Sequence, residues 1–343
     1  EMVIRDWSSD VCSSDLVNQG GDVHKSVRAL RSLDFSVCLE MFMTPTAMQC
    51  DVVLPVLSAL EKEDMGFPWL GNHLLYKRAA VPVSGQARSD YDIYAELSER
   101  MRFGTAFSGG RTASQWLEQF LSDSEVIDHA AFIESGIYFG PGQERVGLAA
   151  FAEAPEDNPL PTPSGKVEIF STAWEQDTGR PPLPVWNHQP SSSSGPSSLP
   201  ESTGQTGVYG MPDVADGHFL LVTPKTIWRT HSQNGAQATW ADRSGDRGIL
   251  TMNPADATSA GLSDGDIVLV SNSHGASSIH LRTDEEVMPG VVCLHQGVWF
   301  DFDADGIDHA GSANVLTSTD GTGPANAPVM HGVPVMVQKD NRP

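Results

Sequence analysis

The chain has 343 residues, and its 21 Lys and Arg against 44 Asp and Glu give a formal charge of −23. A charge of this sign repels the phosphates of nucleic acids and of anionic membrane surfaces, so both are excluded as partners. It also leaves open a source that lives in high salt. The sequence has neither the roughly 20 consecutive apolar residues of a membrane span nor the pattern of a signal peptide.

Residues 1–16 resemble a segment foreign to the protein. Their core, from Asp6 to Leu16, is similar to a translated sequencing adapter and has no amphipathic period. We therefore expect residues 1–16 to be non-native and the gene to extend upstream. A natural disordered terminus is the alternative.

Residues 17–177 begin with the pattern of an α/β sheet domain. Asp22 is a suitable N-cap, and apolar residues at helical spacing from position 23 to 33 predict a helix that ends near Asp34. Alternating residues at 35–41 and the apolar run at 52–56 predict two strands. Helical spacing recurs at 91–100 and 113–121, and we expect these helices to pack on that sheet.

The remaining residues divide into a linker and a second domain. Residues 178–217 are dense in Pro, Ser and Gly and predict an exposed linker. Residues 218–343 have the pattern of a β-barrel, with short apolar or alternating runs separated by Gly, Asn and Asp turns. The runs lie at 219–222, 267–270, 277–281 and 291–294, and a short helix with a glycine stop is expected at 255–261.

The four cysteines do not indicate a metal cluster. Cys12, Cys38, Cys50 and Cys293 show none of the short spacings of zinc knuckles, redox pairs or iron–sulfur ligand sets. They also form no disulfide framework, so they do not indicate the redox compartment.

Ordered motifs run through both halves of the chain. The first half contains E-M-F-M-T-P-T-A at 40–47, C-D-V-V-L-P at 50–55, A-R-S-D-Y-D-I at 87–93 and T-P-S-G-K-V-E-I at 162–169. The second half contains R-T-H-S at 229–232, M-N-P-A-D-A at 252–257, Q-G-V-W at 296–299 and D-H-A-G-S-A-N-V-L-T at 308–317. Together these motifs resemble the dimethyl sulfoxide reductase family of molybdopterin oxidoreductases. The R-T-H-S and D-H motifs resemble most its anaerobic S-oxide reductase branch.

The resemblance implies a fold and a cofactor. The fold is a partial, Rossmann-like α/β sheet domain followed by a C-terminal double-psi β-barrel. The cofactor is bis(molybdopterin guanine dinucleotide) with molybdenum, or with tungsten. In this family the metal ligand and any iron–sulfur cysteines lie upstream, so the resemblance implies no catalytic residue and no metal ligand in this chain.

The resemblance also implies a set of cofactor contacts. Arg offers a forked cation to a phosphate, while hydroxyl and amide groups offer directional hydrogen bonds to a heterocycle. The expected residues are Glu40, Thr44, Thr46, Arg229, His231, Ser232, Gln233, Gln296, Trp299, His309, Asn314 and Thr317.

Simpler interpretations of these residues stay open. Glu40 could be a solvated charge at a strand end, and residues 229–233 a polar surface loop. Asn314 could be the end of a turn, and Trp299 a core anchor, since large aromatic side chains more often pack than bind. Asp51 is at least as likely to cap its turn as to touch the cofactor.

Two other functions suggested by short motifs, calcium binding and serine hydrolysis, are not supported by the sequence. Asp301 to Gly306 imitates the first half of a calcium-binding EF-hand loop, but its twelfth position is Ser312 rather than Glu. The serine-rich stretches contain no nucleophile-elbow pattern, which argues against a Ser-His-Asp hydrolase.

The resemblance implies a molybdenum oxidoreductase that reduces an S- or N-oxide by two-electron oxygen-atom transfer. Two alternatives stay open: a dehydrogenase of formate or another small substrate, and a non-catalytic cofactor-binding fragment. The expected partners are an iron–sulfur electron-transfer subunit and a membrane-anchor subunit. The family resemblance further implies that the assembled enzyme is exported to the periplasmic or extracytoplasmic face of the membrane.

Overall fold

The structure is a computed structural model of the chain, and it divides into two compact units. The barrel unit comprises residues 1–54 and 189–343, and the middle unit comprises residues 55–188. The structure describes residues 15–68, 71–142, 146–179, 182–183, 217–227, 229–233, 235, 247–319, 321–322 and 327–342. Residues 1–14 of the segment expected to be foreign, and most of the expected linker, lie outside these ranges. Within them, no helix has both the length and the apolar character needed to cross a membrane.

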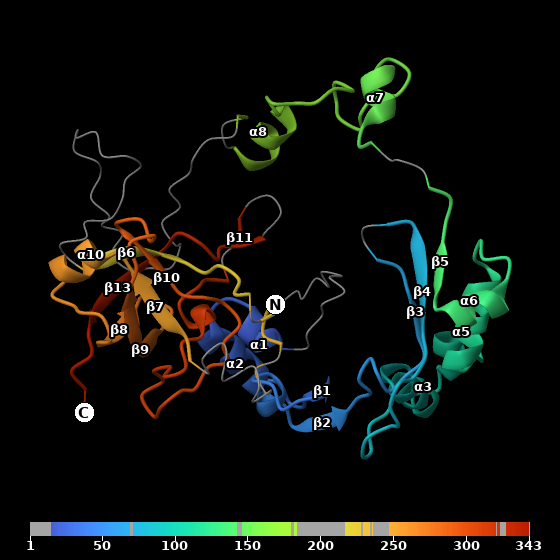
Figure 1. The fold of residues 1–343 in the computed structure, drawn as a ribbon, viewed down its shortest axis with the longest axis horizontal. Coiled ribbons are helices and arrows are strands. Elements are labelled where there is room, and N and C mark those ends of the chain that lie inside the picture. Colours follow the sequence, from blue (N-terminus) through green and yellow to red (C-terminus); the bar gives the residue numbers. More distant parts are fainter. Residues whose placement is uncertain are drawn as a thin grey trace. The chain divides into compact units, whose positions relative to one another are not determined.

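The barrel unit contains a closed six-stranded β-barrel, with neighbours in the order β10, β6, β13, β8, β9, β7 (Figure 1). The pairs β10–β6 and β7–β9 are parallel, and the other pairs are antiparallel. Parallel neighbours need crossover connections, so this barrel is not a simple meander. The expected barrel is confirmed. Its strands are β6 (His218–Val222), β7 (Ile249–Met252), β8 (Ile267–Ser271), β9 (Ala276–Thr283), β10 (Val291–Cys293) and β13 (Val333–Lys339).

One continuous apolar core fills this barrel. Successive side chains of a strand point to opposite faces, so Phe219 and Leu221 of β6 face inward, as do Val268 and Val270 of β8. The outer elements are α10 (Pro254–Ser259), β11 (Gly321–Thr322) and β12 (Ala327–Pro328). The short helix expected at 255–261 is therefore present as α10, and Gly261 follows it with a positive φ of 70°.

Two helices and two strands form the N-terminal segment of the barrel unit. They are α1 (Leu16–Gln19), α2 (Val23–Arg31), β1 (Val37–Glu40) and β2 (Val52–Pro55), with the 3₁₀ turn η1 (Ala47–Gln49) before β2. Asp22 caps α2, because its Oδ1 accepts a hydrogen bond from the backbone N–H of Lys25 at 2.9 Å. The expected order of helix, strand, turn and strand is confirmed, although α2 ends at Arg31, before Asp34.

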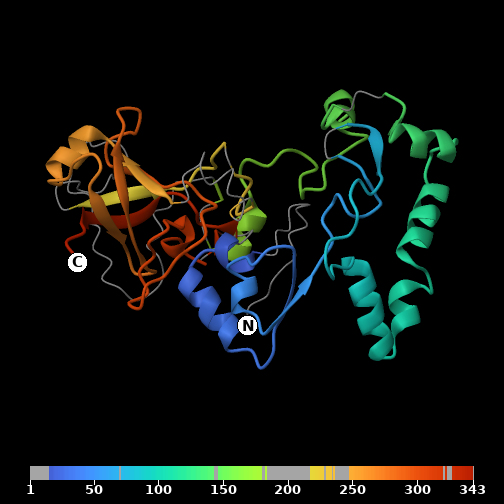
Figure 2. The same cartoon turned by 60° about the horizontal axis from the view of Figure 1, so that its bottom comes forward.

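A small apolar cluster joins this segment to the barrel loops. Val17 and Val23 pack with Val315 of the 3₁₀ turn η4 (Ala313–Val315), and all three side chains are fully buried. Figure 2 shows the two blue N-terminal helices beside this red turn. The ring of His24 also stacks on Phe302, with centroids 4.4 Å apart. The N-terminal helices and the C-terminal loops therefore form one packed body.

The middle unit is a three-stranded antiparallel sheet with helices. The strands are β3 (Asp64–Gly66), β4 (His73–Lys77) and β5 (Ile137–Phe139). The helices are α3 (Asp90–Arg100), α4 (Gly104–Ser108), α5 (Ala113–Ser122), α6 (His129–Ser135), α7 (Ala149–Glu153) and α8 (Thr172–Thr178). The helices expected at 91–100 and 113–121 are confirmed as α3 and α5.

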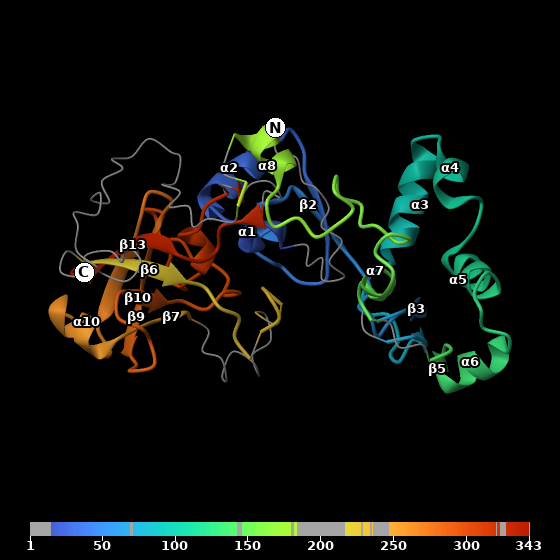
Figure 3. The same ribbon diagram turned by 90° about the horizontal axis from the view of Figure 1, so that it is seen from above.

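The packing partner of α5 differs from the prediction. Leu121 of α5 and Phe132 of α6 form a buried cluster with side chains of β3, β4 and β5. Figure 3 shows α6 next to β5. We had expected the helix to pack on the sheet that β1 and β2 form. The sequence did not predict β3, β4 and β5, because these strands are short and only partly buried.

Candidate functional site

A polar junction lies where α1 meets the loops that follow the barrel strands. Asp15 and Asn18 are at most 2% exposed, although α1 is a single short turn. Val17, between them, belongs to the apolar cluster with Val23 and Val315. The apolar side of this turn is thus anchored in the core. The term junction is used below for the polar side of α1 together with four loop segments. These segments are residues 40–46, 229–233, 296–299 and 312–318.

Thr46 ties the loop after β1 to the start of α1. Its Oγ1 accepts a hydrogen bond from the backbone N–H of Val17 at 2.9 Å and donates one to Oδ1 of Asp15 at 3.1 Å. Thr44 acts within its own loop, because its Oγ1 accepts from the backbone N–H of Ala47 and caps η1. Both predicted threonines are buried and face the junction segment rather than solvent.

Two buried carboxylates lie at the same place. Glu40 is 8% exposed, and its Oε1 accepts from the backbone N–H of Met41 at 2.8 Å. Burial is the main cause that raises the pKa of Asp15, and the charge of Glu40 raises it further, while the hydroxyl groups of Ser232 and Thr46 lower it. Glu40 is therefore not a solvated charge at a strand end.

The loop at 229–233 presents a mixed set of side chains. Arg229 is buried, and its Nη1 donates to the carbonyl of Gly297 at 3.4 Å. Ser232 is also buried, and its Oγ accepts from Nε2 of Gln19 at 3.4 Å. His231 has a positive φ of 54°, and burial together with Lys225 lowers the pKa of its imidazole, so it is neutral at pH 7. Gln233 is exposed.

Trp299 holds the loop at 229–233 against the loop at 296–299. Its indole Nε1 donates to the carbonyl of Ser232 at 2.8 Å. Gly297 has a φ of 101°, and a Cβ there would collide with the carbonyl oxygen of His231, so the two backbones touch. Gln296 is half-buried, and its backbone N–H donates to the carbonyl of Pro224 at 3.1 Å. Trp299 thus acts as an anchor between two loops.

Asn314 and Thr317 close the junction from the other side. Nδ2 of Asn314 donates to the carbonyl of Asn18 at 2.7 Å, and Oδ1 of Asn314 accepts from the hydroxyl of Thr317 at 3.0 Å. The backbone N–H of Asp22 donates to the carbonyl of Thr317 at 2.9 Å. Both functional groups of the Asn314 amide are therefore engaged inside the protein, and the residue fastens the 312–317 loop to α1.

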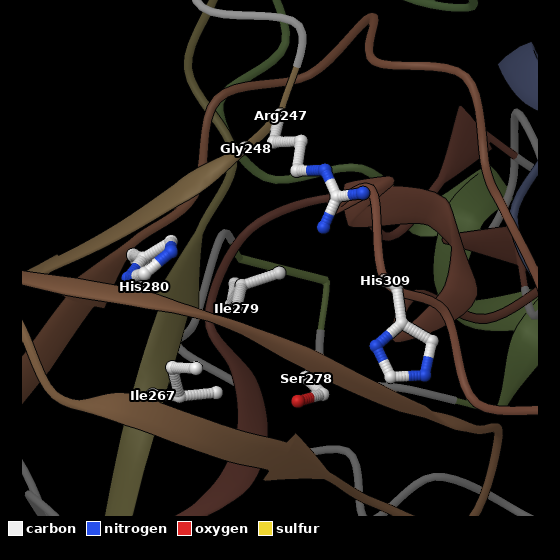
Figure 4. Close-up of a pocket in the computed structure, with 7 residues that line it drawn as sticks. All are labelled: Arg247, Gly248, Ile267, Ser278, Ile279, His280 and His309. Atoms are coloured by element: carbon white, nitrogen blue, oxygen red, sulfur yellow. The ribbon is translucent and has the colours of Figure 1, made fainter.

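His309 is not part of this junction. Its Nε2 lies 2.8 Å from Oδ2 of Asp303, and its ring lines a small open cavity of about 80 Å³ on the barrel wall. Figure 4 shows Arg247, Ser278 and His280 among the other residues that line it. Hydrogen bonds thus tie Thr46, Ser232, Asn314 and Thr317 into the junction, whereas Gln233 is exposed and His309 contacts Asp303.

The EF-hand-like loop is closed on itself. Oδ1 of Asp303 accepts from the backbone N–H groups of Asp305 and Ile307, so this oxygen is already occupied. Within the described ranges, no three His, Cys, Asp or Glu side chains could hold a metal ion together.

Asp308 organises the loop that leads into the junction. The side chain is fully buried, and its two oxygens accept hydrogen bonds from the backbone N–H groups of Asp301, Ala310, Gly311 and Ser312. Ser277 adds its hydroxyl at 3.2 Å. Burial raises the pKa of Asp308, and the backbone donors oppose that shift. A protonated carboxyl would point a hydrogen at one of these five donors, whereas the ionised carboxylate can accept from all of them. We therefore assign Asp308 as charged.

The junction fits a ligand that offers both hydrogen-bond acceptors and donors. Of the side-chain atoms that the structure describes, only Nδ2 of Asn18 and Oδ2 of Asp15 are buried without a hydrogen-bond partner. A buried unsatisfied donor costs about 1–3 kcal/mol, so a site of this kind is expected to be completed by another group. A pterin dinucleotide carries acceptors and donors on its heterocycle edge and acceptors on its phosphates. The residues present are therefore compatible with it.

Sequence reasoning missed Asn18, Gln19 and Asp308 as site residues. Asn18 and Gln19 stand directly after the segment expected to be foreign and carry no periodic signal. Asp308 was part of a quoted motif, but its partners are backbone N–H groups, which no sequence pattern displays. The hydrogen bonds from Ser312 and Asn314 to Asn18 show that these distant segments meet.

Two family models match the chain. The family described as "Molydopterin dinucleotide binding domain" matches residues 219–334, and the family described as "Molybdopterin oxidoreductase" matches residues 11–100. The first range runs from β6 to the start of β13, and the second begins before α1 and ends with α3. The junction is built from parts of both ranges.

Curated relatives are similar over most of the chain. Dimethyl sulfoxide reductase DmsA of Escherichia coli strain K12 is 28% identical over 329 residues, which cover 88% of this chain and 38% of that protein. The dimethyl sulfoxide/trimethylamine N-oxide reductase of Rhodobacter capsulatus is 30% identical over 325 residues, covering 88% and 37%. The chain therefore spans less than two-fifths of the length of these relatives.

A solved structure has the same fold. Acetylene hydratase from Pelobacter acetylenicus aligns with a TM-score of 0.71 and 21% identity, covering 94% of this chain and 42% of that one. At this identity the likeness concerns the fold alone.

Proposed function

Because the chain belongs to the dimethyl sulfoxide reductase family of molybdopterin oxidoreductases, we propose that the whole protein reduces an S-oxide or N-oxide by two-electron oxygen-atom transfer. In this reaction the oxide takes up two electrons and two protons and is released as sulfide or amine with one water. The relatives reported above are named for reduction of dimethyl sulfoxide and trimethylamine N-oxide, and a further relative is named biotin sulfoxide reductase.

One observation carries the proposal. In the barrel unit, residues 15–54 of one matched segment pack against the other matched segment, at a buried polar junction with an unsatisfied donor. A dinucleotide-binding role accounts for that donor, whereas a module that binds only a protein partner does not need it. The junction would hold one edge of the cofactor, and Arg229 offers a cation beside it.

The cofactor supplies the redox centre, and this chain supplies its surroundings. When bound, a molybdenum bis(molybdopterin guanine dinucleotide) group would exchange the two electrons and accept the oxygen. The chain's own residues hold and enclose it. Thr46 and Asn314 fasten their two loops to α1, and Trp299 fastens the loop at 296–299 to the loop at 229–233, so these bonds fix the positions of the loops. His231, neutral at pH 7, could donate or accept one hydrogen bond there.

The resemblance also supports proposals about the assembled enzyme. We propose that electrons reach it from an iron–sulfur subunit, with a membrane-anchor subunit as a further partner. We also propose that it works at the periplasmic or extracytoplasmic face of the membrane.

The test is to express the complete gene anaerobically in a host that makes the cofactor. Molybdenum and released pterin are measured per chain, and dimethyl sulfoxide and trimethylamine N-oxide are offered with a reduced viologen as electron donor. We expect stoichiometric molybdenum and oxidation of the viologen that depends on the oxide. A pterin-loaded protein that oxidises formate and reduces neither oxide would instead support a dehydrogenase. A folded protein without pterin would contradict the proposal.

A further inference from the structure

Asn18 has a buried amide nitrogen that no described residue satisfies. The side chain is 2% exposed, so water does not reach it freely. Its Oδ1 accepts a hydrogen bond from the hydroxyl of Ser312 at 3.1 Å, and its backbone carbonyl accepts one from Asn314. Nδ2 alone is left without a partner. An apolar residue of similar size would avoid the free-energy cost of this donor, so the amide is unfavourable unless something else binds to it.

The direction of this amide is fixed from several sides. Ser312 and Asn314 hold Asn18 directly, and Thr317 in turn holds the amide of Asn314. The neighbouring Val17 is anchored in the apolar cluster, and its backbone N–H is bound by Thr46. Gly21 lies so close to the carbonyl of Ser318 that a Cβ would not fit. Nδ2 is therefore a preorganised donor.

We propose that Asn18 binds the pterin cofactor through Nδ2, and that Ser312 and Asn314 are positioning residues that hold Asn18 in place. This inference rests on the proposed function. The acceptor is a ring nitrogen or carbonyl oxygen of the pterin heterocycle, because a fixed single amide donor matches such an atom. Asn314 acts through Asn18, since its own amide is engaged with Asn18 and Thr317.

Two variants of Asn18 test the proposal in the complete protein. Asn18→Leu removes the amide at similar volume. Asn18→Asp keeps the shape and the acceptor for Ser312 but removes the N–H donor. Each is expressed in a host that makes the cofactor and in a host that cannot, and pterin content per folded chain and Tm are measured in both forms. We expect each variant to bind pterin about tenfold less tightly, which corresponds to one lost hydrogen bond, and so to retain less pterin per folded chain. In the cofactor-free form we expect Asn18→Asp, which keeps the acceptor for Ser312, to change Tm little.

Asn253 provides a matched control in the same unit. Its Nδ2 already donates to the carbonyl of Val287 at 2.9 Å, and its Oδ1 accepts from the backbone N–H of Ala255 at 2.9 Å, both outside the junction. We expect Asn253→Leu to lower Tm equally with and without cofactor, and to leave pterin content per folded chain unchanged.

The results separate the inference from the function it rests on. Wild-type protein with pterin, together with Asn18 variants that retain it fully, would overturn the role of Asn18 and leave the proposed function intact. Variants of Asn18 that behave like Asn253→Leu would show a purely structural role and overturn it as well. A wild-type protein that contains no pterin would overturn both.

Discussion

The barrel and the middle unit differ in the size of their buried apolar cores. The barrel encloses one large apolar core in which Phe219, Leu221 and Leu250 are fully buried. In the middle unit, the buried cluster consists of Leu121, Val126 and Phe132, while Ile127 is 97% exposed. Among the described residues, the two buried side-chain atoms without a hydrogen-bond partner, Nδ2 of Asn18 and Oδ2 of Asp15, both lie at the junction of the barrel unit. Burial in the core and unsatisfied polar atoms are therefore found in different parts of this unit.

The largest effect should come from the barrel core. Leu250→Ala removes a fully buried side chain, and we expect it to lower the free energy of unfolding by about 3–5 kcal/mol. Leu121→Ala in the middle unit should cost about 2 kcal/mol, because its cluster is smaller and its neighbours can relax. Hydrogen exchange read by mass spectrometry reports the two units separately.

Ile127→Ala is the matched control, with an expected change below about 0.5 kcal/mol. If Leu250→Ala were no more costly than Leu121→Ala, the contrast between the two units would be wrong.

A smaller effect should come from the loop that leads to the junction. Asp308→Asn turns part of a fully satisfied acceptor into a donor that faces backbone N–H groups, and we expect a loss of about 2–4 kcal/mol. Limited proteolysis between residues 301 and 312 should become faster. Asp305→Asn, whose side chain is exposed, should leave both measurements unchanged. Equal sensitivity of the two variants would mean that Asp308 does not organise the loop.

The smallest effect concerns Cys38 of β1. Burial raises the pKa of its thiol to about 11, from an ordinary 9.0, and nearby Cys50 adds to the shift. The folded state therefore holds this proton more tightly than the unfolded state. The associated stability is complete below pH 9 and is lost as the pH rises through about 11.

Alkylation by iodoacetamide, followed by mass spectrometry, measures this directly. We expect Cys38 to react slowly up to about pH 10 and faster above it. A Cys50→Ser variant should lower the pH at which the reaction begins, and rapid labelling of Cys38 at pH 8 would refute the shift.

Hydrophobic periodicity predicted those strands and helices in which apolar residues recur at a regular spacing. The alternation in β6, β8 and β9 was visible, as was the helical spacing of α2, α3 and α5. β7 was missed, and β13 was missed because Pro334 interrupts its apolar run. The middle sheet was missed because β3 is three residues long and contains a glycine.

The candidate site was predictable only as a set of motifs. Thr46, Ser232, Asn314 and Thr317 were flagged by resemblance, and the structure brings them together. Their partners were not predictable, because the contact between Asn18 and Asn314 joins residues 296 positions apart. The sequence also could not show that both ends of the Asn314 amide are used inside the protein, which changes the role it can play.

The strand order of the barrel determines how late in synthesis the barrel can close. β13, the last strand of the barrel along the chain, is inserted between β6 and β8, two of the earlier strands. The wall therefore cannot close until residue 339 has left the ribosome, and contacts between such distant segments form slowly. The junction is completed by residues 312–318, so it too is finished late. If a cofactor binds at this junction, it can be inserted only after the last barrel strand has been synthesised. Chains that lack this strand would then not receive the cofactor.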